Sequence, residues 1–117
     1  MITVYGIPNC NTVKKAITWL DQHKIAYQFH DYKKLGITAA KLKQWSEQVG
    51  WEKLLNKKGT TWRTLDSALQ ESVTNEKTAI QVMEKHTSSI KRPVIEKGNK
   101  VIAVGFDESE YAHTFKK

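Results

Sequence analysis

Cysteine is almost absent from this sequence of 117 residues, since Cys10 is the only one. A single thiol excludes any internal disulfide, so no cross-link can stabilise the fold. This composition suits a reducing compartment, and we expect a cytoplasmic protein. Any disulfide that the protein forms must join it to another molecule.

Long hydrophobic runs are absent as well. No apolar stretch approaches the roughly 20 residues that span a bilayer, and the N-terminus opens on a strand pattern instead of the basic and apolar regions of a signal peptide. Hydrophobic residues make up 39% of the chain and charged residues 26%, as in ordinary globular proteins. We therefore expect one domain over residues 1–117 and no membrane partner.

Acidic residues are few relative to basic ones, with 12 Asp and Glu against 19 Lys and Arg and a net charge of +7. The basic residues form no run of five and accompany no helix-turn-helix, zinc-finger or RNA-binding pattern, so direct binding to nucleic acid is not expected. Metal-ligand spacing is also absent, and His23 and His30 are interpreted as surface or structural residues. The positive charge would equally attract a small acidic substrate such as glutathione.

Cys10 lies in the stretch YGIPNCNTVKK, residues 5–15, between a strand pattern and a helix pattern. Residues 2–5 alternate between apolar and polar, which predicts a strand. Asn11 or Thr12 is predicted to cap the helix that follows. One face of that helix is formed by residues at helical spacing, namely Val13, Ala16, Ile17 and Leu20.

A thiol at a helix N-terminus faces backbone N–H groups and the positive end of the helix dipole, which favour the thiolate. A free cysteine with a pKa near 8.5 is about 3% ionised at pH 7, whereas a pKa about two units lower makes it mostly ionised. Lys14 and Lys15 add positive charge one turn further on. A lone cysteine can instead be a small buried hydrophobe, but the position of Cys10 after a Pro-Asn turn favours a nucleophile.

The patterns around Cys10 predict a βαβ unit. A helix over residues 12–23 is followed by an alternating strand pattern over residues 25–30. Strands joined in this way are parallel, and the crossover is right-handed. Cys10 is therefore expected at the carboxyl end of the first strand, where chemistry in such sheets is usually found.

The rest of the chain completes an α/β fold. Residues 38–89 have helical and polar patterns and are interpreted as a helical insertion. Strands over residues 94–95 and 101–104 flank a Gly-Asn turn and predict an antiparallel pair. Asp107 with Glu110 predicts the start of a final helix. The expected result is a mixed central sheet of about four strands.

This order of elements, with Cys10 at the first strand-to-helix turn, resembles the thioredoxin-fold arsenate reductase family. The resemblance covers nearly the whole chain and rests on residues 5–15, on Leu54-Leu55-Asn56 and on Arg92-Pro93-Val94-Ile95. The chain is most similar to a branch of small bacterial proteins described as glutathione-dependent thiol reductases. The resemblance implies a thioredoxin-like fold with the helical insertion between its second and third strands.

Two departures from the family pattern distinguish this chain from the arsenate reductases and from the Spx-type regulators. The glutaredoxin-coupled arsenate reductases hold the oxyanion with three arginines, of which only Arg92 is matched here. Asn56 stands where the first of the three arginines is expected, and Arg63 is a candidate substitute for it. No Arg or Lys lies near Gly105, where the third arginine is expected. Each missing donor would cost about 1.5 to 3 kcal/mol of oxyanion binding. The Spx-type regulators carry a Cys-x-x-Cys switch, which Val13 at the second position excludes.

The resemblance implies a thiol/disulfide oxidoreductase, and the single cysteine makes it a monothiol one. The Cys10 thiolate is expected to attack a disulfide, with an external thiol resolving the adduct. Glutathione is the expected co-substrate, without a metal or bound cofactor, and the candidate partners are a glutathionylated or disulfide substrate and glutaredoxin. An arsenate reductase coupled to glutathione and glutaredoxin, and a non-catalytic Spx-like regulator that binds RNA polymerase, are the alternatives.

The resemblance also implies which residues surround Cys10. The Arg92-Pro93 bond is expected to be cis, with Arg92 facing Cys10. The residues predicted to bind substrate or glutathione are Asn11, Thr12, Lys14, Arg63, Arg92 and Pro93.

Overall fold

The computed structural model describes residues 2–115 and divides the chain into two compact units. The first unit takes the chain up to Leu35 and from Arg92 onward, and it contains the whole sheet. The second unit is Gly36–Lys91, a helical segment with one isolated β-bridge between Leu55 and Ile90. The prediction of a single domain over residues 1–117 stays a prediction.

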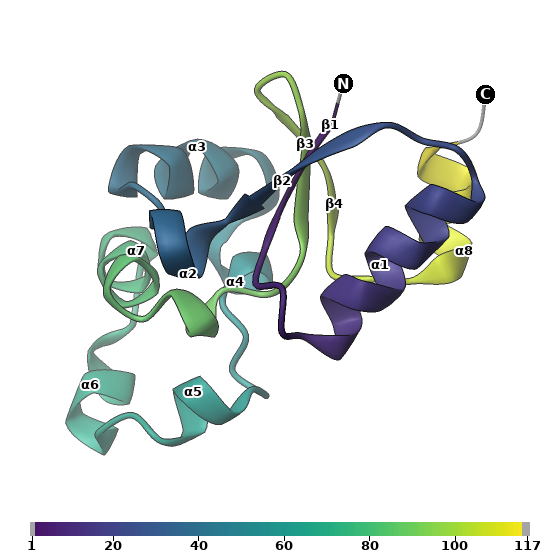
Figure 1. Ribbon diagram of the computed structural model, residues 1–117. Helices are drawn as coiled ribbons and strands as arrows, with labels where there is room; N and C mark the ends of the chain where they lie inside the picture. Colours follow the sequence, from purple (N-terminus) through teal and green to yellow (C-terminus); the bar gives the residue numbers. More distant parts are fainter. Residues whose placement is uncertain (1, 116–117) are drawn as a thin grey trace. The chain divides into compact units, whose positions relative to one another are not determined.

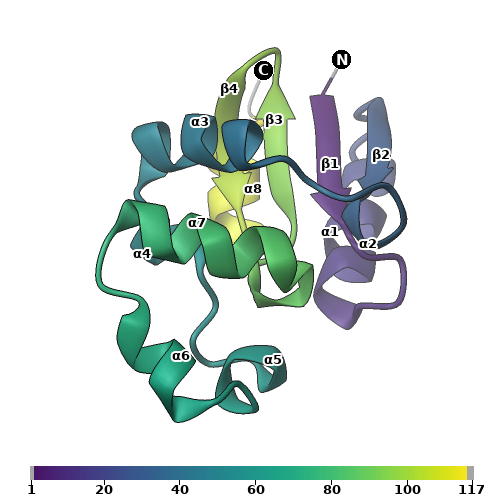
Figure 2. The same cartoon turned by 90° about the vertical axis from the view of Figure 1, so that its left-hand side faces the viewer.

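The first unit is built on a four-stranded mixed sheet in the order β2-β1-β3-β4 (Figures 1 and 2). β1 lies parallel to β2 and antiparallel to β3, while β3 and β4 form an antiparallel hairpin. The predicted βαβ unit, hairpin and α/β sheet are therefore confirmed. The strands are β1 (Ile2–Gly6), β2 (Tyr27–Asp31), β3 (Val94–Lys97) and β4 (Lys100–Val104).

The second strand begins at Tyr27, later than the predicted residue 25. Lys24 adopts a left-handed φ of 57°, and the N–H of Ile25 bonds to the carbonyl of Leu20 at 2.9 Å. These residues therefore close helix α1 (Asn11–Gln22) before the chain can join the sheet.

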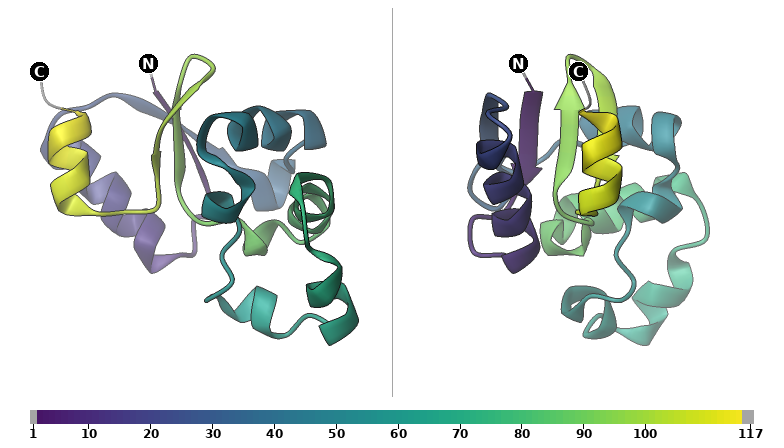
Figure 3. Two further views of the ribbon diagram at one scale, coloured as in Figure 1. Left: turned by 180° about the vertical axis from the view of Figure 1, so that it is seen from behind. Right: turned by 90° about the vertical axis from the view of Figure 1, so that its right-hand side faces the viewer.

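Helices α1 and α8 (Glu108–Thr114) lie side by side against one face of the sheet (Figure 3). Trp19 of α1 meets Tyr111 of α8 edge to face, with 5.5 Å between the ring centroids. Asp107 caps α8 by accepting the N–H of Glu110 at 2.9 Å, as predicted. The apolar cluster that joins sheet and helices consists of Ile2, Val4, Ala16, Trp19, Leu20, Ile95 and Tyr111.

The second unit packs its helices around fully buried side chains such as Leu42, Trp45 and Met83. Thr38 and Asn75 cap its two longest helices, and Asn75 forms a capping box with Thr78. Its elements are α3 (Ala39–Val49), α4 (Trp51–Leu54), α5 (Thr60–Arg63), α6 (Ser67–Ser72), α7 (Glu76–Lys85) and a 3-10 turn, η1 (Thr87–Ser89). No helix within residues 2–115 has the length and apolar character needed to cross a bilayer.

Candidate active site

Cys10 occupies the N-cap position of α1, after the turn that follows β1. Its backbone is extended (φ −145°, ψ 123°), and its carbonyl accepts the N–H of Lys14 at 2.9 Å to begin the helix. Gly6 at the end of β1 lets the strand approach the helix, because a Cβ there would lie 2.9 Å from Cγ2 of Val13. The strand end and the first helical turn together fix the position of the thiol.

The pKa of the half-buried Cys10 thiol is lowered. Burial acts in the opposite direction, because it penalises the charged thiolate. It is outweighed by the backbone N–H of Val13, by the charge of Arg92, by the N–H of Thr12 and by a hydrogen bond from the Arg92 guanidinium. The start of α1 and a cation from a distant part of the sequence thus both stabilise the thiolate, as predicted.

The Arg92-Pro93 segment forms the other side of the site. Its peptide bond is cis, and the Arg92 guanidinium bonds to Cys10, so both predictions are confirmed. The Pro93 carbonyl accepts the N–H of Gly105 at 2.8 Å, and the Gly105 carbonyl accepts the hydroxyl of buried Tyr111 at 2.7 Å. Gly105 has a φ of 80°, a conformation that favours glycine. The segment is therefore tied to the end of β4 and to α8.

Tyr32 is a site residue that the sequence-based prediction missed. It is fully buried and opens α2 (Tyr32–Leu35) directly after β2, whose last residue pairs with the end of β1. The side chain of Asp31 fixes this turn by accepting the N–H groups of the two lysines after Tyr32, at 3.0 and 3.3 Å. The Tyr32 hydroxyl accepts a hydrogen bond from Arg92, the residue that also bonds to Cys10. Arg92 therefore bridges a buried phenol and the thiolate.

Burial raises the pKa of Tyr32, which keeps its hydroxyl neutral. A neutral hydroxyl can orient Arg92 without cancelling its charge. A sequence signal for this role exists: Tyr32 directly follows the second strand of the βαβ unit, at the sheet edge that carries Cys10.

The other predicted binding residues divide between the two units. Asn11, Thr12 and Lys14 are exposed on α1 beside Cys10. Arg63 ends α5 in the second unit, and its part in the site stays a prediction. The prediction that Asn11 or Thr12 caps α1 is wrong, because the chain becomes helical at Asn11 and Cys10 takes the cap position. Within residues 2–115 no group of three or more His, Cys, Asp or Glu side chains could hold a metal ion.

We expect Tyr32→Phe to raise the pKa of Cys10, because Arg92 loses the acceptor that holds it beside the sulfur. The lost hydrogen bond should also lower the free energy of unfolding by about 0.5 to 1.5 kcal/mol. Tyr5→Phe is the matched control: it removes a phenol that donates to Glu96 at 3.1 Å on the same sheet. The rate of Cys10 alkylation against pH should move in the first variant only. An equal movement in both would show that Tyr32 acts through stability alone.

The model of the ArsC family matches residues 5–114 of this chain. The chain belongs to the ArsC family. An uncharacterized protein of Haemophilus influenzae is 45% identical over 115 residues, which cover 98% of this chain and 99% of the relative. The global transcriptional regulator Spx of Streptococcus mutans is 27% identical and covers 94% of this chain and 80% of its own length.

Solved structures agree with this family membership. The YFFB protein is 46% identical with a TM-score of 0.90, covering 97% of this chain and 98% of its own. An arsenate reductase (ArsC) related protein from Brucella melitensis is 44% identical with a TM-score of 0.78. The match covers 99% of this chain and 95% of that protein's chain. The thioredoxin-like fold predicted from the sequence is therefore confirmed.

Proposed function

We propose that this ArsC-family protein is a glutathione-dependent monothiol reductase that acts on mixed disulfides between a protein and glutathione. The observation that supports this most strongly is the Cys10 thiol with its lowered pKa, held between the start of α1 and Arg92 in a sequence without a second cysteine. The thiolate is the form that attacks disulfides. Since no internal thiol can resolve the adduct, a second molecule must do so.

The reaction proceeds in two exchanges. The Cys10 thiolate attacks the glutathione sulfur of the mixed disulfide, so that a Cys10–glutathione bond forms and the substrate sulfur leaves as a thiolate, which takes a proton from water. The thiolate of a free glutathione then attacks the adduct sulfur and releases Cys10. The substrate protein is released as a free thiol. Its glutathione leaves joined to the attacking glutathione as one glutathione disulfide, so each turnover oxidises one free glutathione, without a metal or bound cofactor.

Arg92 can stabilise charge in both exchanges, because its guanidinium already bonds to the attacking sulfur. Asn11, Thr12 and Lys14 are exposed on the neighbouring turn and offer polar and positive groups to the mixed-disulfide substrate. Glutaredoxin is a candidate second partner that would accept the glutathione from Cys10.

The test separates the two exchanges. Incubation with a glutathionylated peptide, without free thiol, should add one glutathione to Cys10, as measured by intact-protein mass and peptide mapping. Reduced glutathione should then remove the adduct and sustain turnover. The proposal is wrong if no adduct forms, or if an adduct forms that glutathione cannot remove.

Two relatives suggest other candidate functions. The Brucella melitensis structure is of an arsenate reductase related protein, and arsenate-dependent oxidation of glutathione would support that activity here. The Spx relatives are transcriptional regulators, and capture of RNA polymerase without any disulfide turnover would support a regulatory role. Mixed-disulfide reduction is favoured, because of the three family arginines only Arg92 is matched at the thiol and the Cys-x-x-Cys pattern is absent.

A further inference from the structure

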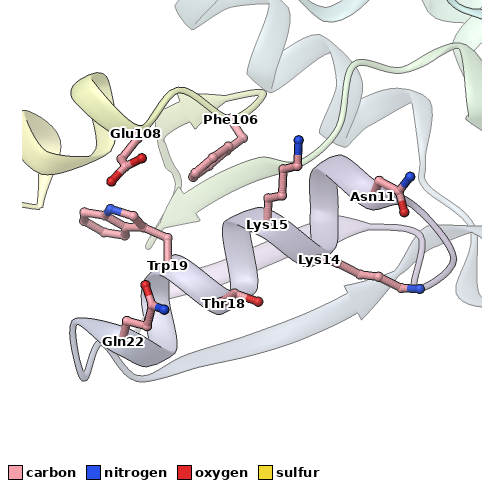
Figure 4. A pocket seen from close by; sticks show the side chains of 8 residues that line it. All are labelled: Asn11, Lys14, Lys15, Thr18, Trp19, Gln22, Phe106 and Glu108. Carbon is pink, nitrogen blue, oxygen red and sulfur yellow. The ribbon is translucent and has the colours of Figure 1, made fainter.

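A groove runs along the outer face of α1, beginning at Asn11 next to the reactive cysteine. It has a volume of about 640 Å³, within the range of ligand sites (about 300–1,000 Å³). One side is formed by exposed polar and charged residues on successive turns of the helix. The opposite wall is Phe106, in the segment that leads into α8, with Glu108 at the start of that helix (Figure 4).

The apolar wall of the groove is held in place by an aromatic cluster. Phe106 packs edge to face on Tyr111 with 4.9 Å between ring centroids, and Tyr111 packs in the same way on Trp19 at 5.5 Å. Trp19 also lines the groove, although it is only 5% exposed. The wall is therefore preformed and would not have to be ordered by a ligand, which reduces the entropic cost of binding.

The length of the groove favours a polypeptide over a tripeptide. Its helical lining extends from Asn11 to Gln22, which at 1.5 Å per residue is about 16 Å. An extended chain rises about 3.3 to 3.6 Å per residue, so the groove accommodates about five residues. Glutathione, a tripeptide, would leave much of it empty.

The two ends of the groove carry charges of opposite sign. Lys14 and Lys15 lie toward the end that carries Cys10, whereas Glu108 lies with Trp19 and Gln22 at the far end (Figure 4). A segment with an acidic side chain beside its cysteine and a basic side chain about four residues away would match both ends. A segment of opposite polarity would place like charges together at each end.

We propose that this groove binds the protein half of the disulfide substrate, as an extended segment with an acidic residue beside the reacting cysteine and a basic residue toward the far end. The inference rests on the proposed function, because it assigns glutathione to the Arg92 side of Cys10 and the substrate polypeptide to the α1 side. The groove is then the part of the protein that distinguishes one glutathionylated protein from another.

The experiment compares two glutathionylated peptides of equal composition, one with Asp beside the cysteine and Lys four residues away, the other with these charges exchanged. The wild-type protein should reduce the first with a higher kcat/KM. Lys15→Glu and Glu108→Lys should each lower kcat/KM for the first peptide by about 3- to 10-fold, and the double variant should prefer the second peptide. In about 1 M salt, where the Debye length is about 3 Å, the preference should nearly vanish.

Two controls make the outcome decisive. Lys100→Glu changes the net charge equally but lies at the start of β4, so the peptide preference should persist. A mixed disulfide of glutathione with a small uncharged thiol has nothing to place in the groove, so its reduction measures any general effect of Lys15→Glu on Cys10. The loss for the first peptide should exceed the loss for this small substrate. Reduction of every substrate with no peptide preference would overturn the groove assignment alone. If no disulfide is reduced at all, the proposed function fails and the groove assignment with it.

Discussion

Replacement of Cys10 by serine should reduce mixed-disulfide turnover to the rate of the buffer, because an alcohol oxygen cannot take part in thiol–disulfide exchange. The same change should not destabilise the fold. Cys10 is the N-cap of α1, and its side chain makes no cap hydrogen bond. Serine is among the preferred N-cap residues and accepts such a bond, which is typically worth about 0.5 to 2 kcal/mol relative to a residue that cannot.

The measurement of stability should be made below the pKa of Cys10. The folded pKa is lower than the unfolded one, so the thiolate contributes stability that is fully present above the unfolded value, near 8.5, and is lost as pH falls through the folded value. Below that window, Cys10→Ser should unfold at a denaturant concentration equal to or above that of the wild type. Loss of activity together with a large loss of stability would indicate that Cys10 is a structural residue.

A cysteine at a position where serine would cap the helix better is a local departure from optimal stability. Such departures are expected at functional sites. The pattern of the first turn therefore supports a chemical role for Cys10 independently of its family resemblance.

The sequence predicted the main elements of the fold because local patterns determine them. Hydrophobic spacing identified α1, the Gly-Asn turn identified the β3–β4 hairpin, and Asp107 identified the start of α8. The errors lie at element ends, as at the start of β2, where the left-handed Lys24 and the hydrogen bond from Ile25 to Leu20 decide the boundary.

The site was predicted only in part, because local patterns reveal some of its residues and not others. Cys10 was found from its local turn, and Arg92 only from the family resemblance, since no periodicity brings residues 82 positions apart together. Tyr32 was missed because its role depends on a single hydrogen bond across the sheet edge. Arg63 lies in the second unit, and its part in the site stays a prediction.

Replacement of Arg92 by methionine should raise the pKa of Cys10 and slow its reaction at neutral pH. The guanidinium lowers the pKa of the thiol both by its charge and by a hydrogen bond, while burial acts against the thiolate. Methionine keeps much of the side-chain volume but supplies neither interaction, so burial is left opposed only by the backbone N–H groups of Thr12 and Val13. The thiolate fraction at pH 7 should fall, and with it the rates of alkylation and of disulfide exchange.

Alkylation rates measured across pH report this change directly. The wild-type midpoint should lie below the value of about 8.5 for free cysteine, and the Arg92→Met midpoint should lie above that of the wild type. At pH values above both midpoints the two alkylation rates should converge, which separates a change in ionisation from a loss of access to the sulfur. Arg92→Lys keeps a positive charge without the planar fork and should fall between them.

The matched control is Lys97→Met, which removes one exposed positive charge from the far end of β3. This variant should leave the Cys10 midpoint where it is in the wild type, because the charge lies at the opposite end of the strand from Arg92. If both substitutions moved the midpoint equally, the net charge of the protein would set the acidity of Cys10, and Arg92 would have no specific role. A wild-type midpoint at or above 8.5 would contradict the thiolate mechanism altogether.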